Sequence, residues 1–328
     1  MHRKERLQTF QGIDTCGDRL ASEILQLVRQ HHGLQYISLI GHSMGGLIVR
    51  YAAGRLFDAQ HGTIAGLTPA HFLTMASPHL GCSTVGEAQV GTFTVLPQPF
   101  FVHLRLRRIR LRRVQVPLIA WMGQGSRLQH IAGALAPRMT TLLCHRTGRQ
   151  LFLTDAALPS GQTFGSQPPQ PAAASCSQPQ PEQVPLVVQL AFDVEGGLQF
   201  RSALAAFRSR TCYANADGDH LVGWANSSLR AASALPTFDA HAPGASKTGV
   251  VHADAVAAAF AASSGNASLE AETVVAGSDA TNAMLSSLQG LPWARVDCSW
   301  RGARVGVFAH NHIQVTRGWL NYEVCASV

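Results

Sequence analysis

The sequence predicts an α/β fold with a mostly parallel sheet, because helical and strand patterns alternate along its first part. Apolar residues recur at helical spacing over residues 12–30 and again over residues 47–56. The runs 36–40 and 71–76 are apolar and β-branched, which is typical of buried strands. When a helix connects two consecutive strands, the strands become parallel and the helix covers a face of the sheet.

The first helix is expected to begin near Gly12 and to end at the polar residues His31 and His32. Either Asp14 or Thr15 can cap its N-terminus with a side-chain oxygen. One apolar face is formed by Leu20, Ile24, Leu25, Leu27 and Val28.

A G-x-S-x-G pentapeptide, Gly41 to Gly45, lies between the predicted strand 36–40 and the predicted helix 47–56. This pattern is weak in isolation, but the strand before it and the helix after it indicate a sharp turn that exposes Ser43 as a nucleophile. We expect Gly41 and Gly45 to be required because a side chain at either position would collide with the neighbouring chain.

Directly after Ser43, the turn is expected to aim the Met44 N–H and the helix N-terminus at the point where an oxyanion would develop. His42 is expected to pack beside the serine rather than to act as its base. A second histidine, His79, lies in the loop after strand 71–76 and is a candidate pocket residue.

The length of 328 residues allows one large domain, and 46% apolar residues suit a substantial core. We predict a single domain over 1–328 that carries an arginine-rich insertion at 86–115 and low-complexity insertions at 160–198 and 231–288. Residues 117–143 have a broadly helical apolar pattern that suits a lid over an acyl pocket or a surface helix pair.

The formal net charge of +7 is concentrated in one region. Six arginines lie between Arg105 and Arg113, and this run is a candidate for peripheral contact with anionic lipid headgroups. We expect no nucleic-acid binding, because aromatic residues do not interleave with the arginines.

Seven cysteines without a C-x-x-C motif or regular spacing argue against a disulfide scaffold and a zinc site. The N-terminus has no apolar h-region, and no apolar run reaches about 18 residues. The sequence therefore predicts an intracellular protein, either cytoplasmic or peripheral to a membrane, with no metal and no cofactor.

Acyl transfer by a serine requires a base and an acid that orients the base. On a sheet of this kind the order along the chain is Ser, Asp or Glu, then His, each after a strand. Ser43 is followed by Asp217 and Asp219 after the predicted strand 210–215, and by His310 after the last predicted strand. Spacing alone leaves open the choice between the two aspartates and between His310 and its rivals, His220, His252 and His312.

Several blocks of the sequence, in this order, resemble the lipase-like serine esterases of the α/β-hydrolase superfamily. The blocks are GID at 12–14, GxRLA at 17–21, IGHSMGGLIVRY at 40–51, ASPHLG at 76–81, TGRQLFLTD at 147–155, YAN at 213–215, DHxVGW at 219–224 and AHNxIQV at 309–315. The resemblance implies an α/β-hydrolase fold and hydrolysis of carboxylic esters, acyl lipids among them, through an acyl-serine intermediate. It also implies Ser43 as the nucleophile, Asp219 as the orienting acid and His310 as the base.

The family has strands before the position of Gly12, one of which ends in a His-Gly loop that supplies a second oxyanion N–H. It also has a helix after the position of Val328. We expect a partial hydrolase fold that lacks these elements and leaves strand 36–40 at an exposed apolar sheet edge. Loss of one oxyanion donor typically costs about 100- to 1,000-fold in rate. The alternative is therefore a catalytically impaired relic, or the product of a truncated gene model, that binds lipid or a protein partner.

Overall fold

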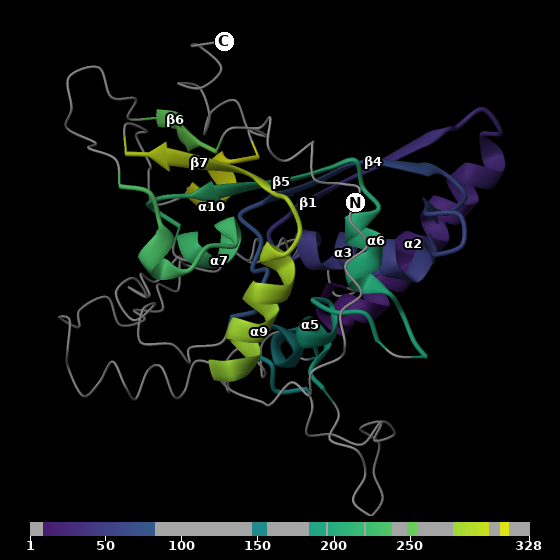
Figure 1. The fold of residues 1–328 in the computed structure, drawn as a ribbon, viewed down its shortest axis with the longest axis horizontal. Coiled ribbons are helices and arrows are strands. Elements are labelled where there is room, and N and C mark those ends of the chain that lie inside the picture. Colours follow the sequence, from purple (N-terminus) through teal and green to yellow (C-terminus); the bar gives the residue numbers. More distant parts are fainter. Residues whose placement is uncertain are drawn as a thin grey trace, which may run out of the picture.

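The computed structural model describes residues 9–82, 146–155, 184–194, 196–219, 221–237, 248–254, 278–301 and 309–314. Its centre is a five-stranded sheet in the order β1-β4-β5-β7-β6 (Figure 1). The strands are β1 Tyr36–His42, β4 Thr68–Met75, β5 Ser209–Asn215, β6 Thr248–Ala253 and β7 Ala294–Trp300. All pairs are parallel except that of β6 with β7. The mostly parallel α/β sheet predicted from the sequence is confirmed.

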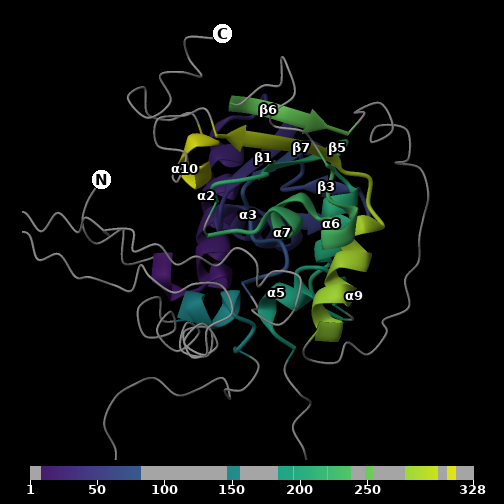
Figure 2. The same ribbon diagram turned by 90° about the vertical axis from the view of Figure 1, so that its left-hand side faces the viewer.

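Helices and two short strands complete the described part of the fold. The α-helices are α2 Ile13–Gln30, α3 Gly45–Leu56, α5 Leu186–Gln189, α6 Phe200–Ala205, α7 Trp224–Ser228, α9 Ser278–Gln289 and α10 Ala309–His312. The 3-10 turns η1 Thr9–Gln11 and η2 Ala232–Ala234, and the antiparallel pair β2 Phe57–Asp58 and β3 Thr63–Ile64, are the remaining elements. The helices α3, α6, α7 and α9 lie on one side of the sheet (Figure 2).

The main core lies between the sheet and these helices. Phe72 of β4 is completely buried, with its ring centroid 5.4 Å from that of Phe207 and 6.1 Å from that of Trp293. Met284 and Leu288 of α9 are completely buried in the same cluster. Because buried aromatic rings contribute large apolar areas, this cluster fixes α9 against the middle of the sheet.

A smaller cluster lies on the opposite face, at the end of β7. Val296, Cys298 and Trp300 alternate along β7 and pack with Ala309 and Ile313. Since alternate residues of a strand share a face, this packing attaches the segment 309–314 to the face of β7 that points away from the main core.

β1 is buried on one face only, although its apolar, β-branched sequence suits a buried strand. Ile37 and Leu39 are buried, whereas Tyr36 and Ile40 are 66% and 62% exposed. Among the described strands, β1 lies at the edge of the sheet, as expected.

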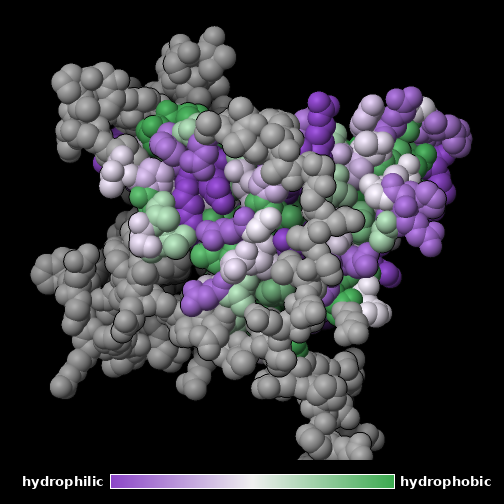
Figure 3. All heavy atoms as spheres, viewed as in Figure 1, coloured by the Kyte–Doolittle hydropathy of each residue, from purple (hydrophilic) through white to green (hydrophobic). Residues whose placement is uncertain are grey.

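The apolar face predicted for α2 is correct in part. Leu20, Ile24 and Val28 pack against the main core. Leu25 and Leu27, however, are 37% and 46% exposed, because the second half of α2 extends beyond its neighbours. The outer end of the molecule, where α2 lies, is largely hydrophilic (Figure 3).

The N-terminus of α2 is capped from a distant segment rather than by either predicted capping residue. Thr147 Oγ1 accepts a hydrogen bond from the Gly12 N–H at 3.0 Å, and Gln150 Oε1 accepts one from the Ile13 N–H at 2.6 Å. The Gln150 amide also donates to Asp14 Oδ1 at 3.0 Å. Residues 146–155 therefore satisfy N–H groups that a helix leaves unpaired at its start.

Parts of the two predicted low-complexity insertions belong to the fold. Within 160–198, Val187 and Leu190 are buried in the main core. Within 231–288 lie η2, β6 and most of α9. The sequence prediction missed these elements because the first range begins with a stretch rich in proline and glutamine, and the second is rich in alanine, serine and glycine.

Other predictions fall outside the described residues. These are the arginine-rich insertion 86–115, which contains Arg105 and Arg113, and the lid-like pattern 117–143. In the described ranges, no helix combines the length and apolar composition that crossing a bilayer requires.

We expect Gln150→Ala to lower the free energy of unfolding by about 1–2 kcal/mol, because it removes a buried acceptor from the first turn of α2. Urea unfolding monitored by circular dichroism measures the change. Gln26→Ala, on the exposed side of the same helix, is the control and should change stability by less than about 0.5 kcal/mol. Equal effects of the two substitutions would contradict the capping role of Gln150.

Candidate active site

Ser43 lies on a strained turn between β1 and α3. Its φ angle is 55°, in the left-handed region that residues with a Cβ rarely occupy. The Ser43 N–H donates to Met75 O at 2.8 Å, and the Ser43 carbonyl accepts from the Gly46 N–H at 3.0 Å. Strain of about 1–3 kcal/mol is typical of such a residue and persists only where the surrounding structure holds it.

The glycines around Ser43 differ in whether their position leaves room for a Cβ atom. A Cβ on Gly41 would lie 2.5 Å from Gly46 Cα, so Gly41 is required as predicted. The prediction for Gly45 is wrong, because a Cβ there would meet no atom within 4 Å. The second constrained glycine is Gly46, where a Cβ would lie 2.7 Å from Ser77 Cβ.

Met44 is the N-cap residue of α3 and has a helical backbone conformation. Its carbonyl accepts hydrogen bonds from the Leu47 and Ile48 N–H groups at 3.0 and 3.1 Å. Within the described ranges no side chain caps this helix. The partial positive charge of the α3 N-terminus therefore lies next to Ser43.

His310 and Asp219 form a buried pair. His310 Nδ1 lies 2.9 Å from Asp219 Oδ2, and the two side chains are 9% and 1% exposed. Asp219 follows β5, and His310 begins its segment after β7. Because parallel strands end at the same edge of a sheet, chain segments far apart in sequence meet there.

Three further donors hold the Asp219 carboxylate. Asn215 Nδ2 donates to Oδ2 at 2.8 Å, and the N–H groups of Leu221 and Val222 donate to Oδ1 at 2.9 and 3.0 Å. Burial alone would raise the pKa of Asp219, but the hydrogen bonds and the charge of His310 outweigh it and hold this pKa below its ordinary value. The carboxylate is therefore ionised at neutral pH and accepts a hydrogen bond from the His310 Nδ1–H group.

Asp217 points elsewhere. Its carboxylate accepts hydrogen bonds from Ser299 Oγ at 2.6 Å and from the Trp300 N–H at 3.2 Å, and it pairs with Arg301 Nε at 3.0 Å. These contacts hold the end of β7. Of the two aspartates that the sequence left open, Asp219 is the partner of His310.

The other histidines considered from the sequence have different surroundings. His252 Nδ1 lies 2.9 Å from Asp297 Oδ2, at the sheet edge opposite to β1. The His312 ring is buried and stacks on Trp300, with centroids 5.2 Å apart. His220 falls outside the described residues.

His79, a candidate pocket residue in the sequence, is completely buried. Its Nδ1 accepts a hydrogen bond from Arg50 Nη2 at 2.7 Å, and its Nε2 lies 3.0 Å from Thr74 Oγ1. Burial lowers the pKa of His79 well below its ordinary range, and the charge of Arg50 lowers it further. Burial also lowers the pKa of Arg50 to about 9. His79 is therefore a neutral residue that fixes the loop behind Ser43.

His42, which the sequence places beside Ser43 as a candidate pocket residue together with His79 and Asp217, contacts the segment that carries His310. The centroids of the two imidazole rings are 4.8 Å apart. His42 directly precedes Ser43 in the chain, so this contact places the His310 ring beside the last residue of β1.

Sequence reasoning missed two residues of this site. Asn215 donates to Asp219, and Gln314 Nε2 lies 3.2 Å from His42 Nε2. Both fall within blocks that carry the family resemblance, at 213–215 and 309–315, and the resemblance was the signal that could have found them.

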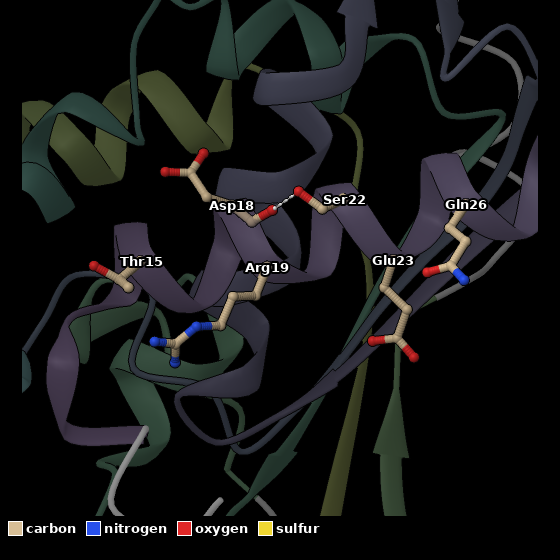
Figure 4. A pocket seen from close by; sticks show the side chains of 6 residues that line it. All are labelled: Thr15, Asp18, Arg19, Ser22, Glu23 and Gln26. Carbon is tan, nitrogen blue, oxygen red and sulfur yellow. Dashed lines mark hydrogen bonds between the residues drawn. The ribbon is translucent and has the colours of Figure 1, made fainter.

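A surface hollow elsewhere on the molecule does not coincide with these residues. It follows one side of α2 and is lined by Thr15, Asp18, Arg19, Ser22, Glu23 and Gln26 (Figure 4). In the described part of the chain, no group of three or more His, Cys, Asp or Glu residues is arranged to hold a metal ion.

Part of the chain is similar to known proteins. Residues 1–111 match the family model described as "Putative serine esterase (DUF676)". The resemblance predicted from the sequence is confirmed. The family match includes Ser43, Met44 and the whole turn between β1 and α3.

Two curated yeast proteins are similar over shorter stretches. "Putative lipase ROG1" of Saccharomyces cerevisiae is 35% identical over 83 residues, which are 25% of this chain and 12% of ROG1. "Putative lipase C4A8.10" of Schizosaccharomyces pombe is 30% identical over 89 residues, which are 26% of this chain and 11% of that protein. No solved structure shows significant similarity to the chain.

We expect Gly46→Ala to destabilise the protein by about 1–3 kcal/mol, because the new Cβ would overlap Ser77, which is completely buried. Gly45→Ala is the matched control and should be neutral or stabilising by up to about 1 kcal/mol, since its Cβ would meet open space. Urea unfolding of the two variants measures the difference. If Gly46→Ala is as stable as Gly45→Ala, the close approach of Gly46 to Ser77 is not a constraint on the fold.

Proposed function

We propose that the chain is a serine hydrolase of carboxylic esters, with Ser43 as nucleophile, His310 as general base and Asp219 as the acid that orients His310. The single observation that carries the proposal is the buried hydrogen bond of 2.9 Å between His310 Nδ1 and Asp219 Oδ2, with the His310 ring next to His42. It is supported by the strained backbone of Ser43 and by the family match.

The protonation states of Asp219 and His310 suit general base catalysis. Because Asp219 is ionised, it accepts a hydrogen bond from the His310 Nδ1–H group, and the lone pair of the neutral ring is then on Nε2. Nε2 takes the proton of the Ser43 hydroxyl as Oγ attacks the ester carbonyl. The imidazolium returns that proton to the alkoxide leaving group, and an acyl-serine forms.

The same groups serve the second half of the reaction. A water molecule gives its proton to His310 Nε2 and attacks the acyl-serine, and the imidazolium then returns the proton to Ser43 Oγ. The Met44 N–H and the N-terminus of α3 stabilise the oxyanion in both steps. The mechanism uses no metal and no cofactor.

The proposed substrates are carboxylic esters of apolar acyl chains, acyl lipids among them. This choice follows the two similar yeast proteins, which are named as lipases. The membrane contact proposed for Arg105 to Arg113 would bring the chain to such substrates, and anionic vesicles would test it separately from ester hydrolysis.

A fluorophosphonate probe tests the nucleophile. We expect the wild-type chain to be labelled at one residue, Ser43, and the label to disappear in Ser43→Ala. Ser77→Ala is the control, because Ser77 is completely buried behind the turn and should not react. A folded wild-type chain that is not labelled would contradict the proposal and favour a non-catalytic relic that binds lipid or a partner.

A pair of isosteric substitutions tests the orienting acid. Asp219→Asn should lower kcat for a short-chain nitrophenyl ester by about 10³- to 10⁴-fold, because an amide no longer holds the required tautomer of the base. Asp217→Asn should lower kcat by less than about tenfold, since Asp217 contacts only the end of β7 among the described residues. The opposite ranking would assign the role to Asp217.

A further inference from the structure

His42 makes a hydrogen bond that joins the nucleophile strand to the backbone of His310. His42 Nε2 lies 2.7 Å from the His310 carbonyl oxygen, across 268 positions of sequence. A carbonyl oxygen can only accept, so the His42 ring carries its proton on Nε2 and donates it; in this tautomer Gln314 Nε2, 3.2 Å from His42 Nε2, contacts the ring without donating to it. This bond fixes the main chain of His310, whereas Asp219 holds its side chain.

Apart from those with His42, the described contacts of the segment that carries His310 involve β7, Asp219 and a cluster that includes Ala76 and Tyr213, but no other residue of β1. α10 is a helix of four residues, and Ala309 and Ile313 pack with residues of β7. The ring of His312 stacks on Trp300 at the end of the same strand. Two strands, β4 and β5, separate β7 from β1 in the sheet. In the part of the chain that the structure describes, His42 is therefore the link between α10 and the strand that ends at Ser43.

The electrostatics of His42 suit a structural donor next to a base. Burial lowers the pKa of His42, the hydrogen bond to the His310 carbonyl raises it in part, and the charge of His310 lowers it again. The ring is therefore neutral at neutral pH. It places no positive charge 4.8 Å from the ring that must accept a proton.

We infer that His42 is a positioning residue for the proposed reaction, which holds the backbone of His310 at the turn so that its Nε2 stays within reach of Ser43 Oγ. The inference rests on the proposed function. A base displaced by about 1 Å from its productive position can cost about 100-fold in rate, so a single backbone anchor is sufficient to matter. The effect should fall on kcat, because His42 holds the base rather than the substrate.

Three substitutions separate the hydrogen bond from the shape of the ring. His42→Phe keeps a ring and removes the donor. His42→Gln keeps an N–H donor at a similar reach and removes the ring, and His42→Met has a similar length with no donor. We expect His42→Phe and His42→Met to lower kcat by about 10- to 100-fold with KM changed by less than about threefold. His42→Gln should recover kcat to within about fivefold of wild type.

His71 supplies the matched control. Its Nδ1 lies 2.7 Å from Ser209 Oγ, a bond of the same length between neighbouring strands but at the start of β5. His71→Phe should leave kcat within about twofold of wild type, and Ser43→Ala gives the background rate for every measurement. Thermal unfolding of all variants identifies any loss that follows from instability, and His42→Met replaces His42→Phe if the latter does not fold.

The outcomes distinguish the inference from the proposed function. A wild-type chain without hydrolysis above the Ser43→Ala background overturns both. If the wild type is active and the variants that lack the donor retain kcat within about threefold, the positioning role alone is wrong. It is also wrong if His42→Gln loses as much kcat as His42→Met, because ring packing rather than the hydrogen bond would then be responsible. Loss in the variants without a donor and recovery in His42→Gln support it.

Discussion

Where β1 runs into α3, the chain turns so tightly that the backbone of Gly46 occupies the space that a Cβ on Gly41 would need. This contact forces the residue between them, Ser43, into a left-handed conformation at φ 55°. On its far side, Gly46 lies against Ser77, which is completely buried. The strain at Ser43 is therefore held by a backbone contact on one side of the turn and by the buried Ser77 side chain on the other.

The parallel sheet explains how the remaining groups reach this turn. β1, β5 and β7 end at the same edge, so residues that follow them are brought together although they are far apart in sequence. The pair of Asp219 and His310 forms after β5 and β7, and His42 connects it to β1. The Asp219 side chain receives hydrogen bonds from Asn215 and from two backbone N–H groups, and the backbone carbonyl of His310 receives one from His42.

The sequence predicted the elements whose pattern is local. The helices over 13–30 and 45–56 and the strands β1, β4, β5 and β7 follow from apolar periodicity. The choice of Asp219 over Asp217 could not come from spacing, because both flank Gly218 in one turn and their partners lie on other strands. Only the family resemblance made that choice.

Other features could not be predicted because their physical cause is non-local. β6 and α9 lie in a range rich in small residues, and they are fixed by pairing with β7 and by packing with the main core. Gly45 matches the pentapeptide motif, yet the close contact belongs to Gly46, one residue further along the helix. The edge position of β1, with Ile40 exposed, was expected from the family resemblance, whereas its own apolar sequence does not reveal it.

The attachment of Thr147 and Gln150 to the start of α2 has a consequence for biosynthesis. The two acceptor residues lie 135 and 137 positions after the residues whose N–H groups donate to them. When only the segment up to Cys82 has left the ribosome, α2, β1 and α3 have been synthesised. The two side chains that complete the first turn of α2 have not. During this interval the Gly12 and Ile13 amides remain bonded to water, and the nascent segment matures only after residue 150 has emerged from the exit tunnel.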